Sequence, residues 1–174
     1  MLNFYKLNKK MKILNQFTIA LFSVILLSSC GSESPKKEVE TKAEVLAEKV
    51  WEEIEVSAIG NTMMEMKYSV ENITVQEGSW VRIILKNEGV DAAMVHNILF
   101  VNFGKRKDVA LKANEVGPDA DFIPSHSDLI AASGLALPGE TVTLEFEAPK
   151  KGNYEFFCSY PGHADMMKGY LFVK

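Results

Sequence analysis

The sequence predicts an all-β domain, an antiparallel sandwich or barrel with one short helical insertion. Two observations predict this fold. Beyond Trp51 the chain consists of short runs rich in β-branched and aromatic residues, separated by Gly, Pro, Asn and Asp. Within residues 141–146 apolar and polar residues alternate, as a strand with one buried face requires. The clearest predicted strands are residues 73–75, 81–85, 98–101, 141–146, 154–158 and 170–173. Residues 105–120 lack this alternation and predict the helical insertion.

Residues 1–30 have the pattern of an export signal. Lysines lead into an apolar run over residues 17–27, which ends in Leu-Ser-Ser-Cys and resembles the cleavage box of bacterial lipoproteins. This run is too short to span a bilayer, which takes about 20 apolar residues. We expect residues 1–30 to be a lipoprotein signal peptide and Cys30 to carry the lipid. An uncleaved anchor is the alternative, and Met11 is a second candidate start.

A polar segment follows the export signal. Residues 31–50 are rich in Ser, Pro, Lys and Glu and contain few side chains that a core could bury. Such a composition is typical of a flexible tether, with room for a short helix over residues 40–49. The sequence therefore predicts a tether over residues 31–50 and a folded domain over residues 51–174.

The charge of the chain argues against a nucleic-acid partner. Without the four lysines of residues 1–30, fifteen basic side chains stand against twenty-three acidic ones. Binding to phosphates requires a basic face, so nucleic acid is excluded as a ligand class. A basic protein partner remains compatible with this charge.

The chain contains two cysteines, and one of them is predicted to be lipidated. Cys158 would then be a lone thiol in an exported protein, acting as an inert buried group, a nucleophile or a metal ligand. The residues that follow it include His163 and Met167, and all three lie between two predicted strands. Thiolate and thioether sulfur suit Cu(I), while imidazole serves both oxidation states of copper. Pro161 and Gly162 allow the sharp turn that such a loop needs.

A blue copper site also requires a second histidine from elsewhere in the chain. Two candidates remain, His96 and His126. His96 stands at the start of an apolar strand, where a rigid sheet would point its imidazole into the site. We expect His126 to be a surface histidine without a metal-binding role.

The spacing Cys-x4-His-x3-Met, with Pro-Gly-His and Met-Lys-Gly in place, resembles the azurins of the cupredoxin family. The resemblance extends more weakly over residues 53–174, including Ile59-Gly60-Asn61 and the His-Asn pair at 96 and 97. It implies a Greek-key β-sandwich of the cupredoxin type, one type 1 copper ion and single-electron transfer. The cysteines of the azurin disulfide have no counterpart here.

The resemblance also implies a role for each matching residue. His96, Cys158 and His163 would be the equatorial copper ligands, and Met167 would be the axial one. Asn97 matches an asparagine that ties the two ligand-bearing segments together by hydrogen bonds. Val95 stands where azurins have a glycine whose carbonyl approaches copper, so a contact from the Val95 carbonyl is left open.

An apolar patch above the metal is a further expectation from this resemblance. Met94, Tyr160, Pro161 and Met166 should surround His163, and exposed apolar patches often mark docking sites. Electrons would then cross through the edge of the His163 ring to a redox protein, such as cytochrome c or a terminal reductase or oxidase. Simple packing of the loop is the alternative.

The ligand set favours an electron carrier over an enzyme. Four protein ligands leave no open position for substrate, whereas catalytic metals keep one. An oxidase with additional copper sites would need more histidines, and His126 is the one left over. Copper storage or delivery is the alternative function, because it uses the same ligands, and a plain adhesion domain would leave the loop unexplained. We expect the protein in the periplasm or cell envelope, with Ser32 favouring the outer over the inner membrane.

Overall fold

The computed structural model describes residue 49 and residues 51–174. The chain divides into two units, Met1–Glu44 and Val45–Lys174, and the described fold belongs to the second. The predicted signal peptide, the lipid attachment at Cys30 and the tether, Lys49 apart, lie outside the described residues. Among the described residues, no helix is both long and apolar enough to cross a membrane.

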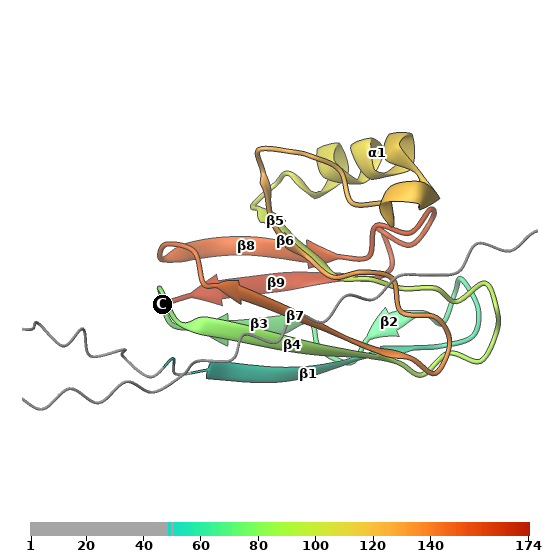
Figure 1. Ribbon diagram of the computed structural model, residues 1–174, viewed down its shortest axis with the longest axis horizontal. Helices are drawn as coiled ribbons and strands as arrows, with labels where there is room; N and C mark the ends of the chain where they lie inside the picture. The colour runs from blue at the N-terminus through green and yellow to red at the C-terminus, as the bar shows by residue number, and fades with distance from the viewer. Residues whose placement is uncertain (1–48, 50) are drawn as a thin grey trace, which may run out of the picture. The chain divides into compact units, whose positions relative to one another are not determined.

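Two β-sheets face each other and form the body of the fold (Figure 1). The first sheet has the order β2-β1-β4-β7, and its strands are β1 (Trp51–Ile59), β2 (Lys67–Tyr68), β4 (Trp80–Asn87) and β7 (Thr141–Glu147). The second sheet has the order β3-β9-β8-β5-β6, and its strands are β3 (Asn72–Val75), β5 (Leu99–Asn102), β6 (Leu129–Ala132), β8 (Gly152–Phe157) and β9 (Lys168–Val173). The predicted all-β sandwich is confirmed.

Two of the strand pairings are parallel, which the expectation of an antiparallel fold did not include. β1 pairs in parallel with β4, and β3 pairs in parallel with β9, while the remaining pairings are antiparallel. The reason is the path of the chain. Between β1 and β4 the chain crosses to the second sheet to form β3 and then returns, and parallel neighbours require such a crossover connection.

The alternation of side chains along the strands produces two apolar clusters. Ile83, Leu85, Phe100 and Phe156 are fully buried members of the larger cluster, which fills the space between the sheets. Each such side chain contributes roughly 1.5–3 kcal/mol when it leaves water. On the other face of the second sheet lies a smaller cluster made of Leu99, Val101, Val109 and Phe157.

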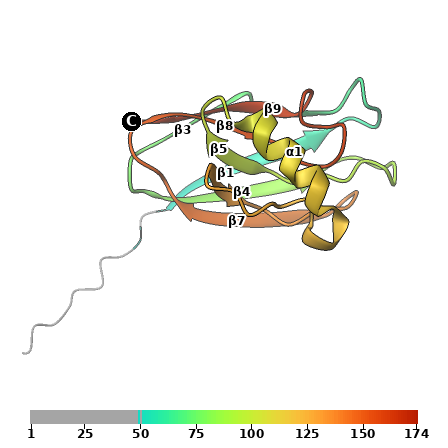
Figure 2. The same cartoon turned by 90° about the horizontal axis from the view of Figure 1, so that it is seen from above.

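Helix α1 (Arg106–Val116) covers this smaller cluster, and the short 3-10 helix η1 (Pro118–Ala120) follows it. Figure 2 shows α1 in front of the second sheet, which is consistent with its contacts to β5 and β8. The helical insertion predicted within residues 105–120 is therefore confirmed. Val109 and Ala113, one turn apart, face the sheet because residues four apart share one side of a helix.

The six predicted strands are all present, with ends that differ by up to two residues. Three strands were missed. β2 has two residues and β6 consists of Leu, Ile and two Ala, so neither carries a strong strand pattern. In β1 three glutamates interrupt the apolar residues, although Val56 and Ala58 point into the core.

Candidate metal centre

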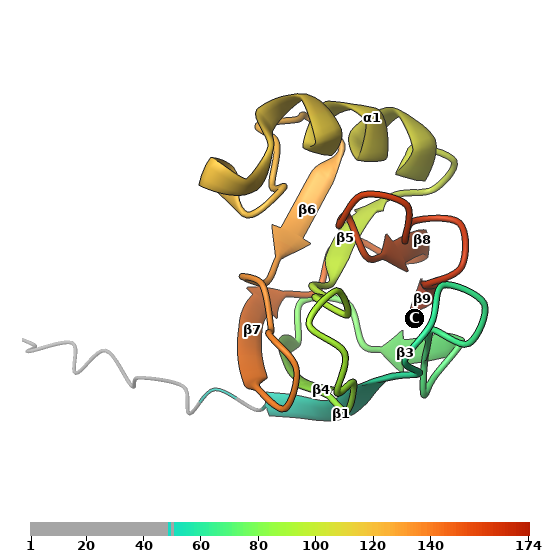
Figure 3. The same cartoon turned by 90° about the vertical axis from the view of Figure 1, so that its right-hand side faces the viewer.

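The site lies at one end of the sandwich, where the loops after β1, before β5 and between β8 and β9 gather. Figure 1 has this end on its right, and Figure 3 looks onto it. The pleat of the strands brings the candidate side chains inward. His96 lies two and four residues before the core residues Ile98 and Phe100, and Cys158 lies two residues after Phe156, so each side chain points to the same face as those core residues. Met167 lies two residues before Gly169, the first buried residue of β9.

Three donor atoms from these segments converge. The Cys158 Sγ lies 3.9 Å from the His96 Nδ1 and 3.7 Å from the His163 Nδ1, and the two Nδ1 atoms are 3.2 Å apart. Among the described residues, these three side chains form the one group of at least three His, Cys, Asp or Glu residues that could hold a metal ion. The structure thus brings together one thiol and two imidazoles that are separated by up to 67 positions in the sequence.

The triangle of donor atoms has the size that a first-row metal ion requires. A point equidistant from the three atoms lies about 2.1 Å from each of them, and metal bonds to imidazole nitrogen and thiolate sulfur are roughly 2.0–2.3 Å long. Two imidazole nitrogens that face each other at 3.2 Å repel unless a proton or a cation lies between them. The donor set of two histidines and one cysteine suits copper.

Burial controls the protonation of the three groups. Desolvation, and then repulsion from His163, lowers the pKa of His96 from 6.5 to about 4. Desolvation also lowers the pKa of His163. Both imidazoles are therefore neutral at pH 7 and ready to bind a cation. Burial raises the pKa of the Cys158 thiol to about 11, so this group must lose its proton as the metal binds.

Met167 and Met166 differ sharply in their positions. Met167 is fully buried and belongs to the same core cluster as Cys158, whereas 46% of Met166 is exposed. The backbone amide of Cys158 donates a hydrogen bond to the Met167 carbonyl at 3.0 Å. Met167 is therefore the methionine that lies on the inner side of the loop, as its spacing from His163 predicts.

Local turns shape the loop between β8 and β9. The His163 amide donates to the Tyr160 carbonyl at 3.0 Å, and the amides of Met166 and Met167 both donate to the His163 carbonyl, at 3.0 and 2.9 Å. Gly162 adopts a φ of 83°, a left-handed conformation that favours glycine. The turn expected at Pro161 and Gly162 is thus present in the structure.

Asn87 and Ala136, which lie outside the segment of His96, hold that segment in place. His96 and Ala136 form an isolated bridge, with N–O distances of 3.1 and 2.7 Å. The amide of the buried Asn87 side chain donates to the carbonyls of Met94 and Ala136, at 2.7 and 2.9 Å. The Asn87 side-chain oxygen accepts from the Gly89 amide at 2.9 Å. The end of β4 therefore fixes the chain that leads into His96.

Asn97 joins the two ligand-bearing segments. Its side-chain oxygen accepts from the Ser159 amide at 2.9 Å, and its side-chain nitrogen donates to the Ser159 hydroxyl at 2.8 Å. Ser159 follows Cys158 directly, so these bonds connect the residue after one ligand to the residue after another. The buried Tyr68 hydroxyl donates to the Asn97 carbonyl at 2.5 Å, and burial raises its pKa well above 10.0.

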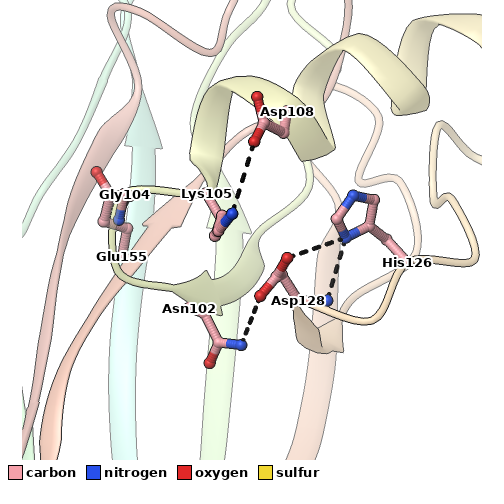
Figure 4. Close-up of polar contacts among 7 residues, drawn as sticks. All are labelled: Asn102, Gly104, Lys105, Asp108, His126, Asp128 and Glu155. Atoms are coloured by element: carbon pink, nitrogen blue, oxygen red, sulfur yellow. Dashed lines mark hydrogen bonds and ion pairs between the residues drawn. The ribbon is translucent and has the colours of Figure 1, made fainter.

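His126 takes part in a separate polar group (Figure 4). Its Nδ1 accepts a hydrogen bond from the Asp128 amide at 3.1 Å and lies 3.7 Å from the Asp128 carboxylate. Asp128 in turn accepts from the side chain of Asn102 at 2.8 Å. His126 is not a member of the metal-binding cluster, and its side chain is 21% exposed.

The predicted apolar patch needs one correction. Met94 is 4% exposed, because it packs into the core beside Gly89, so the expectation that it lines the surface is wrong. Tyr160 is half-buried, with its ring 4.9 Å from the His163 ring, centroid to centroid. Pro161 and Met166 are exposed. Other exposed apolar residues occur in the loops at this end of the sandwich, and they are Met63, Met64, Val90 and Leu137.

Sequence reasoning missed several residues that support the site. Asn87, Tyr68 and Arg106 carry no local signal, because they contact the ligand segments only after the chain has folded. Ser159 could have been found, since it sits next to Cys158 and a buried hydroxyl needs partners.

Comparison with known proteins agrees with this geometry. Residues 54–174 match the family described as copper binding proteins, plastocyanin/azurin family. The chain is 36% identical over 118 residues to auracyanin-A of Chloroflexus aurantiacus, covering 66% of this chain and 72% of that protein. It is 30% identical over 122 residues to azurin of Alcaligenes faecalis, covering 66% and 94%. The solved structure of auracyanin A, a "blue" copper protein, aligns with a TM-score of 0.65 at 33% identity, over 72% of this chain and all of that one.

The two-sheet fold and the cluster of one cysteine and two histidines define a blue copper protein, a class of electron carriers. The chain belongs to the plastocyanin/azurin family of copper-binding proteins, and copper is its cofactor.

Proposed function

We propose that His96, Cys158, His163 and Met167 would hold copper, and that the protein passes single electrons between redox partners of the cell envelope. The convergence of the Sγ and the two Nδ1 atoms carries this proposal. Bound copper supplies a one-electron couple, because this ligand set serves both of its oxidation states.

The protein's own residues then have distinct tasks. The two neutral imidazoles offer lone pairs, and Cys158 gives up its proton on binding. The bonds from Asn97 to Ser159 keep the sulfur and the His96 ring at a fixed separation. Because these residues are buried and hydrogen-bonded, they need to move little when the charge of the site changes, which favours fast electron transfer.

Burial supports an electron carrier over copper storage or delivery. His96, Cys158 and Met167 are fully buried, and His163 is 1% exposed. A delivery protein needs ligands that a recipient can reach and exchange, whereas ligands held inside a core retain their metal. The same full set of protein ligands supports a carrier rather than an enzyme.

Titration of the purified chain with Cu(II) tests this function. We expect an intense blue absorption band that ascorbate bleaches and air restores. Cys158→Ser should abolish the band while the domain stays folded, and His126→Gln is the matched control that should leave it unchanged. A folded protein without the band, or a band that persists in Cys158→Ser, would contradict the proposal. Rapid copper loss to a chelator in the wild type would favour the delivery function.

We propose the apolar surface around His163 as the docking face for redox partners. A Cβ atom added to Gly162 would lie 3.0 Å from the Met63 Cε, so Met63 lies beside the loop of His163. Met63 and Met166 are each 46% exposed, and Pro161, which follows Tyr160 in the sequence, is also exposed. An apolar surface next to the ligand that is nearest to solvent would let a partner approach the metal closely.

Electron-transfer rates with a purified cytochrome c test the docking face. Met166→Glu should slow the reaction at least several-fold while leaving the blue band and the ascorbate rate unchanged. Phe103→Glu is the matched control, because Phe103 is 61% exposed and follows the opposite end of β5. Equal effects of both variants would show that charge alone matters and would refute the docking face.

We also propose that Cys30 is lipidated and anchors the domain in the cell envelope, in the outer rather than the inner membrane. The support is the sequence Leu27-Ser28-Ser29-Cys30 and the absence of an Asp after Gly31. Fractionation of cells that express the full chain tests this. Cys30→Ala should move the protein out of the membrane fraction, and a distribution that does not change would overturn the anchor.

A further inference from the structure

One buried arginine connects the helical insertion to the metal-binding loop. Arg106 is the first residue of α1 and only 8% exposed. Its Nη1 donates a hydrogen bond to the Ala164 carbonyl at 2.6 Å and another to the Asp165 carboxylate at 3.0 Å. Its Nε has no hydrogen-bond partner but lies 3.9 Å from the Glu155 carboxylate. A single guanidinium thus contacts both β8 and the loop that follows it.

These contacts flank the ligands. Ala164 directly follows His163, and Asp165 lies two residues before Met167. Glu155 lies in β8, three residues before Cys158, and its other carboxylate oxygen accepts from the Gly104 amide at 2.8 Å. Figure 4 shows Glu155 beside Gly104, and Gly104 lies in the turn that leads into the helix. The residues bound to Arg106 are therefore neighbours in sequence of three of the four proposed ligands.

The guanidinium is the main polar link between the helix and the loop. A hollow of about 390 Å³ separates them nearby, and its lining includes Lys107, Asn114 and Gly162. Beside this hollow, Ala164 packs against the smaller apolar cluster that includes Val109 of α1, so the guanidinium adds a polar link to an apolar contact. A charge-assisted hydrogen bond is about twice as strong as a neutral one, and a buried guanidinium that lost its partners would be an uncompensated buried charge. Arg106 and the loop therefore constrain each other.

We propose that Arg106 is a positioning residue that holds the Ala164–Asp165 backbone and thereby the His163 imidazole in the geometry that binds copper. The proposal rests on the proposed ligand set. Arg106 touches no ligand side chain and acts through the turn in which the Met166 and Met167 amides bond to the His163 carbonyl. Groups that orient metal ligands typically change metal affinity by 10–100-fold when they are removed.

Arg106→Met tests this role, because methionine keeps much of the volume of the arginine stem and removes the donors. Lys107→Met is the matched control, since Lys107 is exposed on the same helix, whereas the hydrogen bonds to the loop come from Arg106. In the full chain we expect Arg106→Met to weaken copper binding at least ten-fold and to change the positions of the visible bands. Lys107→Met should change neither. Arg106→Lys should recover part of the affinity, because an ammonium can still reach one of the acceptors.

Amide hydrogen exchange of the metal-free chain gives a second readout. The Met166 and Met167 amides should exchange about ten-fold faster in Arg106→Met, while the amides of β4 keep their wild-type rates. Wild-type affinity together with wild-type exchange in this variant would overturn the positioning role. If Arg106→Met fails to fold, Arg106→Lys decides by the same two measurements. A wild-type chain that binds no copper would refute the proposed function instead, and the exchange result would still decide whether Arg106 clamps the loop.

Discussion

The two segments that carry the metal ligands are built differently. The loop from Cys158 to Met167 supplies three proposed ligands within ten residues and closes on itself through the bonds to the Tyr160 and His163 carbonyls. The segment of His96 supplies one ligand and depends on partners outside it, namely Asn87 at the end of β4 and the more distant Ala136 and Ser159. Local turns therefore prepare most of this metal site, while its last ligand requires the assembled sheets.

The largest expected effect follows from breaking the support of the His96 segment. Asn87→Ala would leave the Met94 carbonyl and the Gly89 amide without a partner, and the Ala136 carbonyl would keep only the bond from the His96 amide. Buried unpaired groups cost about 1–3 kcal/mol each, so we expect a loss of roughly 4 kcal/mol in the free energy of unfolding, measured by denaturant titration. Asn153→Ala, at an exposed position of β8, is the control and should cost little. A loss below about 1 kcal/mol in Asn87→Ala would show that the segment holds itself.

The pH dependence of the stability of the metal-free domain tests how the same segment buries His96. The pKa of His96 is lowered to about 4 in the fold, so the unfolded chain binds this proton more readily. Above pH 6.5 the His96 ring is neutral in both states and does not lower the free energy of unfolding. As the pH drops from 6.5 to about 4, the free energy of unfolding falls by roughly 3 kcal/mol. Denaturant titrations between pH 8 and pH 4 measure this loss. His96→Gln should flatten the profile, and a slope equal to that of the wild type would contradict the assignment.

The link between the two segments should have a smaller effect. Asn97→Ala removes the acceptor of the Ser159 amide while the Ser159 hydroxyl keeps its bond to the Phe122 carbonyl, and it should cost roughly 2 kcal/mol. Ser159→Ala keeps the backbone bond to Asn97 and should cost roughly 1 kcal/mol. Because both changes break one network, the double variant should be less unstable than the sum of the two. Additive losses in denaturant titrations would mean that the segments are held independently.

The smallest effect is expected within the loop itself. Gly162→Ala places a side chain at a φ of 83° and should cost about 1 kcal/mol, since the nearby Met63 Cε is the end of a flexible side chain. Gly152→Ala is the control, because a Cβ there meets only ordinary contacts near 3.5 Å. Differential scanning calorimetry of both variants measures the difference. A greater loss in Gly152→Ala would contradict the role of the Gly162 turn.

The loop of Cys158 and the segment of His96 also differ in how far they can be predicted from the sequence. The spacing of Cys158, His163 and Met167 indicated a metal loop, because ligands of one turn are also neighbours in the sequence. His96 was chosen over His126 from its place at a strand start and from family resemblance, and the structure brings its Nδ1 to the Cys158 sulfur. Met94 was misplaced, since an apolar residue before a strand can face either the core or the solvent.

Strand prediction succeeded where β-branched and aromatic residues alternate, as in β7, and failed for β1, β2 and β6. The parallel pairings of β1 with β4 and of β3 with β9 depend on the crossing of the chain between sheets. No local pattern records such a crossing, because each strand has the same alternation whichever neighbour it finds.

The fold class, the helical insertion and the ligand types of the loop follow from the amino-acid sequence, because side-chain alternation, turn residues and donor spacing are local properties of the chain. The residues that surround and complete the site follow from the folded structure. The closure of the two sheets brings the His96 ring to Cys158, sets Asn87 against the Ala136 carbonyl and places Arg106 on the loop of His163. These contacts join residues that are far apart in the chain, and they form only when the packing of the core fixes the distance between the sheets.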